Sequence, residues 1–245
     1  MGVPMGSGEG LVAFAEGAVT QLRREFKVLL EPDAANALAE RLCAYAGPST
    51  TAITSVYFDR VGFPLLARAR ATPHDCMKVR TKEYFPDRVS RGPSVVLEAK
   101  RELDGLTEKQ RLWISRASLS GLVRQGALWK QLPILETGGL LPALAVTYVR
   151  DVFQCAPSWR VTIDRGVAFH GVDAALAFGR RRLRADLLGS PIARERRAVI
   201  EVKHVGEELP AWLAELGHSA AARFSKFADG MAHLESSEVA SAQGG

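Results

Sequence analysis

The sequence is poor in cysteine: it holds only Cys43, Cys76 and Cys155, with no Cys-x-x-Cys pair. An odd number at wide spacing argues against a disulfide framework and against a thiolate zinc site. Long apolar runs are also lacking. No stretch reaches the roughly 18 continuous apolar residues of a membrane-spanning helix, and residues 1–10 lack the apolar core of a signal peptide. We therefore expect a cytoplasmic protein.

Lysine is scarce too, with eight residues among the 32 Lys and Arg of the 245-residue chain. The 47% hydrophobic and 24% charged composition is that of a folded protein, and no linker divides it. We predict one domain over residues 21–234 with flexible ends at 1–20 and 235–245. The net charge of +5 favours anionic partners without choosing among nucleic acid, membrane surface and phosphate compounds.

Short segments in which polar and apolar residues alternate predict that most of the chain is β-strand. Residues Thr107–Gln110 fit both a strand and the start of a helix, so the transition there stays open. The predicted helices are Pro32–Ala46, Ser118–Leu132 and Ala211–Leu234. The predicted strands are Gln21–Leu30, Thr51–Asp59, Asp75–Tyr84, Val95–Glu102, Leu144–Arg150, Trp159–Asp164 and Arg197–His204.

The polar faces of these strands are unusually cationic. Lys78, Arg80 and Lys82 share one face, and six strands carry a cation on the polar side. For a single strand a water-facing role is the simpler reading. Like charges at neighbouring sheet positions are destabilising, however, and a solvated face would normally mix in Ser, Thr and Glu. If the faces curl inward, the sheet encloses a positive lumen that needs a polyanion such as a chain of phosphates.

Short motifs occur in order along the chain. They are Glu25-Phe26-Lys27, residues 55–59, Lys78-Val79-Arg80, Glu98-Ala99-Lys100, Lys109-Gln110-Arg111, Tyr148-Val149-Arg150, residues 160–164, Glu201-Val202-Lys203 and Ser225-Lys226-Phe227. With these motifs, the sequence from about residue 23 to 231 resembles the VTC domain, the polyphosphate polymerase domain of the vacuolar transporter chaperone complex, in the triphosphate tunnel metalloenzyme (CYTH-like) superfamily. The resemblance implies an α+β fold, a closed antiparallel β-barrel with a basic lumen and flanking helices.

The resemblance also implies roles for individual residues. The implied catalytic residues are Lys78, Arg80, Arg150, Arg160 and Glu201. The implied substrate-binding residues are Lys27, Lys100, Lys109, Arg111, Lys203, Ser225 and Lys226. Glu201 is the implied metal ligand, usually for manganese, with magnesium as the alternative. Glu25, Glu98 and Asp164 are implied supporting acids, as metal ligands through water or as partners of nearby cations, and for Asp164 an arginine ion pair is equally favoured. Asp59 and Tyr148 are expected to be structural.

One position departs from the superfamily pattern. Arg23 stands where the first of two carboxylates is common, leaving only Glu25 before Lys27. This departure favours phosphoryl transfer with one metal over hydrolysis with two. The implied function is transfer of the ATP γ-phosphate to a polyphosphate chain inside the tunnel.

Two other functions remain open. One is hydrolysis of an inorganic or nucleoside triphosphate by the same cations. The other is non-catalytic binding of polyphosphate or nucleic acid through the arginine runs at residues 180–184 and 194–197, although nucleic acid is the less favoured partner. The resemblance does not include membrane-spanning parts, so a separate membrane partner is conceivable, and the sequence does not predict the oligomeric state.

Overall fold

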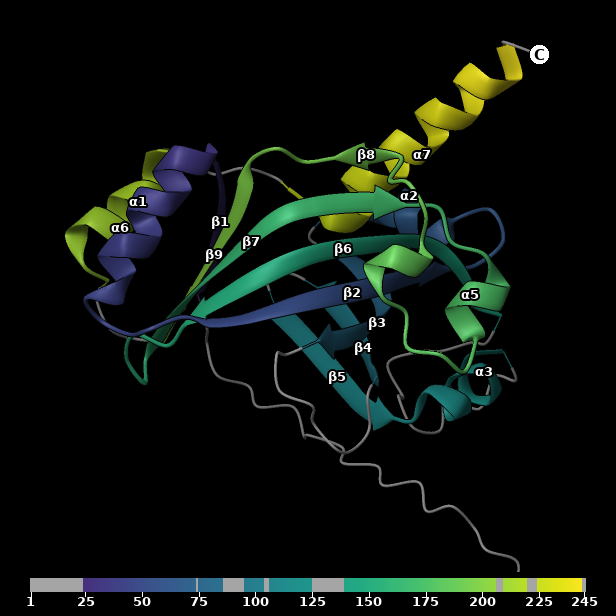
Figure 1. The fold of residues 1–245 in the computed structure, drawn as a ribbon, viewed down its shortest axis with the longest axis horizontal. Helices are drawn as coiled ribbons and strands as arrows, with labels where there is room; N and C mark the ends of the chain where they lie inside the picture. Colours follow the sequence, from purple (N-terminus) through teal and green to yellow (C-terminus); the bar gives the residue numbers. More distant parts are fainter. Residues whose placement is uncertain are drawn as a thin grey trace, which may run out of the picture.

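The computed structural model describes residues 24–73, 75–85, 95–103, 106–124, 139–205, 209–219 and 224–243. Within them the strands form one nine-stranded antiparallel sheet in the order β1-β9-β7-β6-β2-β3-β4-β5, with the short β8 paired to β7 (Figure 1). The strands are β1 Arg24–Leu30, β2 Ser49–Asp59, β3 Asp75–Phe85, β4 Val95–Leu103, β5 Leu106–Ile114, β6 Leu141–Phe153, β7 Trp159–His170, β8 Ala193–Arg194 and β9 Ala198–His204.

Each segment with polar and apolar alternation forms a strand, although Gln21, Leu22 and Arg23 lie outside the described residues. The ambiguous segment at Thr107 belongs to β5, because the alternation of Lys109, Arg111 and Trp113 continues to Ile114. Strands β2, β3, β4, β6 and β7 are longer than predicted, most of all β6, which begins at Leu141, and β7, which continues to His170. The transition that the sequence left open at β5 follows the strand pattern.

The helices flank the sheet. Helix α1 Pro32–Cys43 ends three residues before its predicted end. Helix α3 Arg116–Arg124 begins two residues before its predicted start, and residues 125–132 of that prediction lie outside the described part. Helix α2 Pro64–Ala71 was not predicted. Asp59 accepts its first backbone N–H groups: the carboxylate lies 3.0 and 2.9 Å from the nitrogens of Leu65 and Leu66. The short α5 Ala174–Phe178 and the 3₁₀ turn η1 Ala185–Leu187 were not predicted either.

The prediction of a single helix over Ala211–Leu234 is wrong. The structure has α6 Ala211–Ser219 and a separate α7 Lys226–Gln243. Ser225 begins α7 as its N-cap: its Oγ accepts the N–H of Ala228 at 3.4 Å, while Asp229 accepts the N–H of Ser225 at 2.7 Å. This reciprocal capping is a helix start signal. It places Lys226 at the beginning of a helix rather than in the middle of one.

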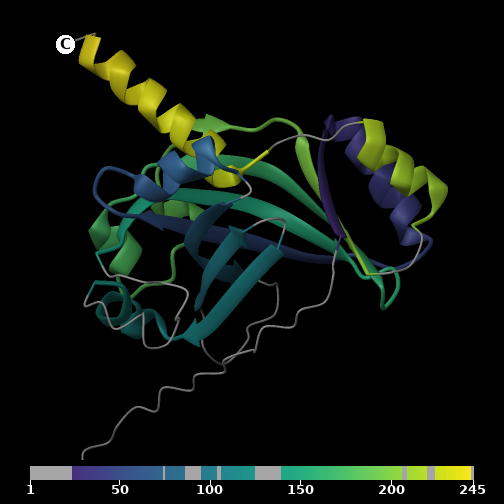
Figure 2. The same cartoon turned by 180° about the vertical axis from the view of Figure 1, so that it is seen from behind.

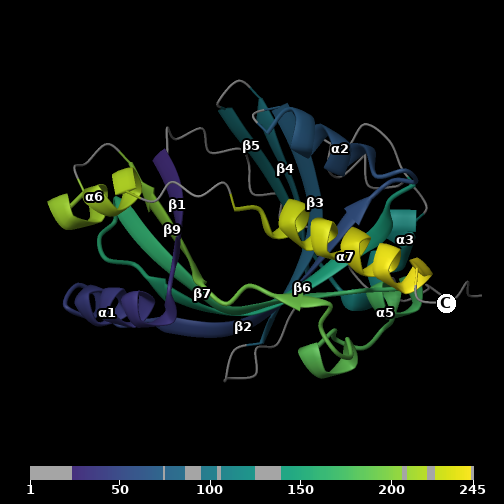
Figure 3. The same cartoon turned by 90° about the horizontal axis from the view of Figure 1, so that it is seen from above.

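The sheet is strongly curved, so that it wraps around a concave face. Viewed from above, β1 and β9 form one side, β6, β7 and β2 the base, and β3, β4 and β5 the other side (Figure 3). Within the described residues β1 and β5 are the two edges and do not pair with each other, so hydrogen bonds do not close the barrel completely. The architecture is the expected α+β tunnel fold.

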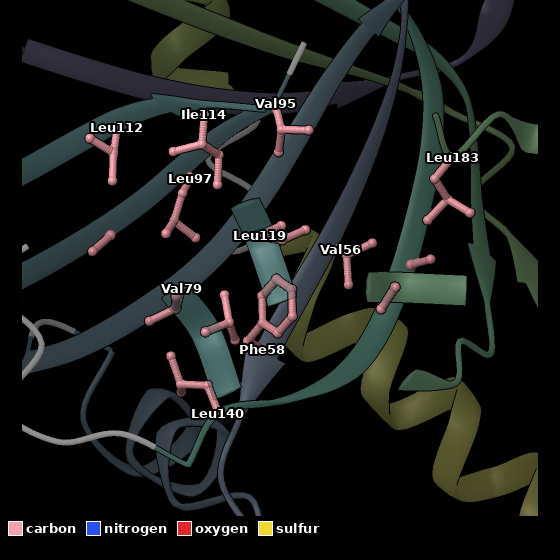
Figure 4. Packing of buried hydrophobic residues seen from close by; sticks show 14 of the residues in the cluster. Val56, Phe58, Val79, Val95, Leu97, Leu112, Ile114, Leu119, Leu140 and Leu183 are labelled. Atoms are coloured by element: carbon pink, nitrogen blue, oxygen red, sulfur yellow. The ribbon is translucent and has the colours of Figure 1, made fainter. Parts of the chain in front are cut away.

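Apolar side chains on the convex face pack beneath the outer helices. Figure 4 shows one such cluster, in which Leu97, Ile114 and Val79 of the strands gather around Leu119 of α3. A second cluster lies beneath α1 and α6, on the far arm of the sheet, and includes Leu42 (Figure 2). Because every second residue of a strand is buried on the convex face, the residues between them point to the concave face.

A third apolar cluster fills one end of the concave face, where α7 packs against the sheet. The ring of Phe227 stacks on Tyr57 with centroids 5.1 Å apart. Gly230 lies so close to the sheet that an added Cβ would be 2.4 Å from Leu144 and 2.6 Å from Phe169. The helix therefore closes this end of the concave face. No described helix is both long and apolar enough to cross a bilayer.

Candidate functional site

The concave face gathers charged side chains from seven strands and α7. Their alternation in each strand explains the convergence, because the intervening residues are buried on the convex face. We call this set the charged concave face. It comprises eleven cations, Lys27, Lys78, Arg80, Lys82, Lys100, Lys109, Arg111, Arg150, Arg160, Lys203 and Lys226, and five carboxylates, Glu25, Glu98, Glu102, Asp164 and Glu201. Cations exceed carboxylates there by six.

Glu98 of β4 is the centre of the first charge cluster. Its carboxylate is 1% exposed and accepts the Nε of Arg80 at 2.8 Å, the Nζ of Lys109 at 2.9 Å and the Nε of Arg111 at 3.1 Å. The Nζ of Lys82 lies 3.5 Å away. Burial alone would raise the pKa of Glu98, but these cations outweigh it and hold that pKa far below its usual range. The carboxylate is therefore ionised and organises four cations.

Lysines stand directly opposite one another in three adjacent strands. In the sheet register Lys78 of β3 pairs with Lys100 of β4, which pairs with Lys109 of β5. Lys100 is paired with Glu102 and Lys109 with Glu98, whereas no carboxylate lies within 4 Å of the Lys78 ammonium among the described residues. Like charges directly opposite in a sheet destabilise it. This row of three lysines is thus incompletely neutralised by the protein itself.

The second cluster lies across the base of the sheet and is centred on Asp164 of β7. Arg150, its register partner in β6, donates to Asp164 through Nε and a terminal nitrogen at 2.6 and 2.7 Å. Lys226 of α7 donates to the same carboxylate at 2.6 Å. Burial would raise the pKa of Asp164, but Lys226 and Arg150 lower it. The start of α7 is therefore bound into the charged face through Lys226.

Glu25 and Glu201 form a third group near the β1 edge. Both carboxylates accept the Nζ of Lys203, at 2.9 Å for Glu25 and 2.6 Å for Glu201. Glu25 also lies 2.8 Å from the Nζ of Lys27, which is the register partner of Glu201. Burial opposes ionisation of Glu201, but Lys203, Lys27 and Arg150 outweigh it and set its pKa well below the usual value. The two carboxylates therefore share one ammonium.

The two arms of the sheet face each other across the concave space. Burial opposes the charge on Lys27 of β1, but nearby carboxylates, among them Glu102 of β4, outweigh it and raise its pKa. Strands β1 and β4 do not pair in the sheet, so this attraction acts across the space between them. Tyr57 and Tyr148 lie between the clusters: Arg80 donates to the Tyr57 hydroxyl at 3.0 Å, and Lys226 lies 4.7 Å from the Tyr148 ring centre. Burial raises the pKa of Tyr148 to about 12, so its hydroxyl stays protonated.

Glu25 and Glu201 are the carboxylates that fit a divalent metal. No group of three or more His, Cys, Asp or Glu side chains in the described ranges is arranged to hold one. A pair that already shares the Lys203 ammonium has the charge and the convergence to hold a cation, and phosphate oxygens and water would complete an oxygen shell. Glu98 and Asp164 differ, because arginine and lysine already surround them.

The remaining predicted residues are distributed around this face. Arg160 is the register partner of Lys203, and Ser225 caps α7 next to Lys226. The arginine run at residues 180–184 lies off the charged concave face, where Arg182 contacts the ring of Phe85 with 4.4 Å to its centre. The structural role expected for Asp59 is confirmed by its contacts with the start of α2. His74 lies outside the described residues.

Two residues of the charged concave face, and Tyr57 beside it, were not predicted as site residues from the sequence. Lys82 is 4% exposed and lies within the Glu98 cluster, and Glu102 is paired with Lys100. Strand alternation could have identified both, because each follows a predicted site residue by two positions. Tyr57 carries no such signal, since its place beside Arg80 depends on the pairing of β2 with β3.

Comparisons with known proteins agree with this architecture. The chain is similar to a putative adenylyl cyclase, HpAC1, from Hippeastrum, which has a dominant triphosphatase activity: identity is 14%, coverage 83% of this chain and 92% of that one, and the TM-score 0.51. It is also similar to a putative adenylate cyclase from Bacillus halodurans at 14% identity, 86% and 96% coverage, and a TM-score of 0.52. At this identity the likeness shows the fold alone. A search of curated proteins finds no match.

A family model gives the more specific result. The model described as VTC domain matches residues 15–235, which include every strand and every residue of the charged concave face. The curved antiparallel sheet, the inward rows of Lys and Arg and the match over most of the sequence agree with one another. This chain therefore belongs to the VTC domain family and has the triphosphate tunnel fold.

Proposed function

We propose that the charged concave face binds a chain of phosphates and transfers the γ-phosphoryl group of ATP to the end of a polyphosphate. The observation that carries this proposal is the row formed by Lys78, Lys100 and Lys109, three cations in direct register that the protein only partly neutralises. Such a row is stable when an anion with regularly spaced charges lies along it. Polyphosphate supplies charges of that kind.

The chemistry of phosphoryl transfer agrees with this face. The transition state requires neutralisation of spreading negative charge and in-line placement of the attacking and leaving oxygens, with little covalent work by the protein. Arg80 and Arg150 are oriented by Glu98 and Asp164, so their planar groups are preset to bind pairs of phosphate oxygens. Lys78 supplies a compact charge that has no carboxylate of its own within 4 Å among the described residues. Preset cations stabilise the developing charge without rearranging during the reaction.

Glu201 and Glu25 are the residues that we assign to a divalent metal, manganese by the family resemblance, with magnesium as the alternative. The metal would supply charge to bridge phosphate oxygens and polarise the transferred phosphoryl group. Lys203 is paired with both carboxylates and Lys27 with Glu25, so these two lysines would lie beside a bound metal and could also contact substrate phosphates. Glu98 and Asp164 are assigned as positioning residues, because each is already surrounded by arginine and lysine.

Hydrolysis of a triphosphate is the second candidate. The same cations would bind the substrate, and water would replace the polyphosphate end as acceptor. The triphosphatase activity of the Hippeastrum protein, which has this fold, favours this alternative. A purely binding role through the arginine runs has less support, because Arg182 of the first run lies against the ring of Phe85 and Arg197 of the second is paired with Glu195.

The test is incubation of the purified protein with γ-labelled ATP and manganese, followed by separation of long chains from orthophosphate. We expect labelled chains from the wild type. Lys78→Ala should lower chain synthesis about tenfold or more, because it removes the least neutralised charge of the row. Glu201→Gln should abolish synthesis, and its manganese affinity should fall in parallel. Release of orthophosphate without chains would refute the polymerase and support the hydrolase.

Arg181→Ala is the matched control, since it removes an exposed arginine that lies off the charged concave face. Its synthesis rate should stay within twofold of the wild type. If Arg181→Ala lowers the rate as much as Lys78→Ala does, the arginine run rather than the concave face binds the phosphates, and the proposed site is wrong.

A further inference from the structure

A cavity of about 790 Å³ lies beside the charged concave face and is not part of it. Its walls come from the end of β1, the segment between β8 and β9, and the first turns of α7. The volume is in the range of small-molecule sites. The residues that bear on its chemistry are Glu31, Phe169, Glu195, Phe224, Asp229 and His233, together with three arginines.

The charges of this cavity are balanced, unlike those of the charged concave face. Its cations are Arg194, Arg196 and Arg197, and its carboxylates are Glu31, Glu195 and Asp229, three of each. Arg197 and Glu195 neutralise one another through two hydrogen bonds of 3.0 Å. A polyanion gains little from walls without net charge. The cavity is therefore suited to an uncharged group that forms hydrogen bonds.

Aromatic rings form another part of the wall. The exposed ring of His233 and the half-buried ring of Phe224, which precedes α7, line the cavity, and the buried Phe169 packs behind His233 with ring centroids 5.6 Å apart. Flat rings next to polar groups are the usual surroundings of a nucleobase, because stacking needs only a π face. Arginine and carboxylate side chains supply donors and acceptors for a base and a ribose. Together these features match the chemistry of a nucleoside.

The cavity adjoins the phosphate-binding residues at two places. Leu29, in its wall, is two residues from Lys27 on the same face of β1, a step of about 7 Å along a strand. Phe224 is likewise two residues before Lys226, which contacts Asp164 at 2.6 Å and lies 5.9 Å from the Phe224 ring centre. A ligand whose phosphates contact Lys27 and Lys226 would place its next chemical group at this cavity.

We propose that this cavity binds the nucleoside of a nucleoside triphosphate whose phosphates lie on the charged concave face. The inference rests on the proposed function and deepens it, because it assigns the donor end of the substrate to the α7 side. The acceptor polyphosphate would then extend toward the lysine row of β3, β4 and β5. The cavity is thus a specificity site that distinguishes a nucleotide from an inorganic chain of equal phosphate number.

The experiment compares the binding of ATP and of inorganic tripolyphosphate, which share the triphosphate and differ in the nucleoside. Titration calorimetry without divalent metal measures binding in the absence of turnover. We expect Phe224→Leu and His233→Ala together to weaken ATP binding about fivefold or more and to leave tripolyphosphate binding within twofold. His218→Ala is the matched control, an exposed histidine on α6 outside the cavity. It should change neither ligand's affinity.

Two outcomes would overturn the proposal. Equal weakening of ATP and tripolyphosphate would show that the cavity acts on the phosphate chain, as a path for polyphosphate would. Unchanged binding of both ligands by a variant with a normal melting temperature would show that the nucleoside lies elsewhere. The labelled-ATP assay tests the proposed phosphoryl transfer separately. If that assay yields no polyphosphate chains, the difference between ATP and tripolyphosphate binding still tests the nucleoside site.

Discussion

Replacement of Glu98 by Gln tests the central electrostatic claim about the charged concave face. The carboxylate is 1% exposed and has four cationic side chains within 4 Å: Arg80, Lys82, Lys109 and Arg111. Glutamine keeps the shape and removes the charge, so these cations would repel one another without compensation. Removing one partner of a buried ion pair costs about 3–5 kcal/mol. For a chain of this size that corresponds to a fall in melting temperature of roughly 6–20 °C.

Glu108→Gln is the matched control for this substitution. Glu108 lies on the neighbouring β5, is exposed, and contacts only the Gln110 side-chain amide, at 2.9 Å, among the hydrogen bonds of the described residues. Surface changes of this kind usually alter stability by less than about 0.5 kcal/mol. Thermal and urea unfolding of the wild type, Glu98→Gln and Glu108→Gln would compare their free energies of unfolding.

Tripolyphosphate should partly restore the stability of Glu98→Gln, because the ligand brings the missing negative charge. The melting temperature of the variant should rise more with ligand than that of the wild type. A loss of less than about 1 kcal/mol without ligand would refute the reasoning, since it would mean that solvent already screens these cations. A smaller rise with ligand in the variant would contradict it as well.

The pH dependence follows from the direction of the pKa shift. The pKa of Glu98 is far below its usual range in the folded protein, while that of an unfolded Glu is about 4.3. Its contribution to stability is therefore present above about pH 4.3 and is lost as the pH falls below that value toward the folded pKa. Glu98→Gln lacks this contribution, so its stability should fall less steeply between about pH 5 and pH 2 than that of the wild type.

Three further predictions concern packing, helix capping and charge. Gly230→Ala should lower the free energy of unfolding by about 1–3 kcal/mol, because the new Cβ would lie 2.4 Å from a Leu144 methyl. Gly47→Ala is the control and should be nearly neutral, because nothing lies within 4 Å of its Cβ. Equal losses of thermal stability in the two variants would contradict the packing of α7. Asp59→Asn should lower stability by about 1 kcal/mol by weakening the cap of α2, and unchanged urea unfolding would argue against that role. Burial lowers the pKa of Lys109 to about 8, so this lysine loses its charge between pH 7 and pH 9. The affinity for tripolyphosphate should therefore fall over that range in the wild type and change less in Lys109→Arg, which stays charged. The same pH dependence in both proteins would show that Lys109 does not bind the phosphates.

Much of the site could be predicted because strand alternation is a local property. Lys78 and Arg80 are two residues apart, so any strand containing both must direct them to the same side. The start of α7 was missed, although Ser225 and Asp229 hold the local capping signal, because the apolar residues on both sides also fit one long helix. Helix α2 was not predicted because its first N–H groups are bound by the Asp59 carboxylate, and that contact forms only after the chain turns back at Pro64.

Sequence by itself determined which side chains share a strand face and that those faces are cationic, because both depend on neighbours along the chain. Only the tertiary structure decided which faces meet. The register placed Lys78, Lys100 and Lys109 in one row, and the curvature turned the two arms of the sheet toward each other across the concave face (Figure 3). The cavity beside α7 likewise needs three segments that are distant along the chain. Such contacts arise from sheet pairing and helix packing, which act between residues that no local pattern connects.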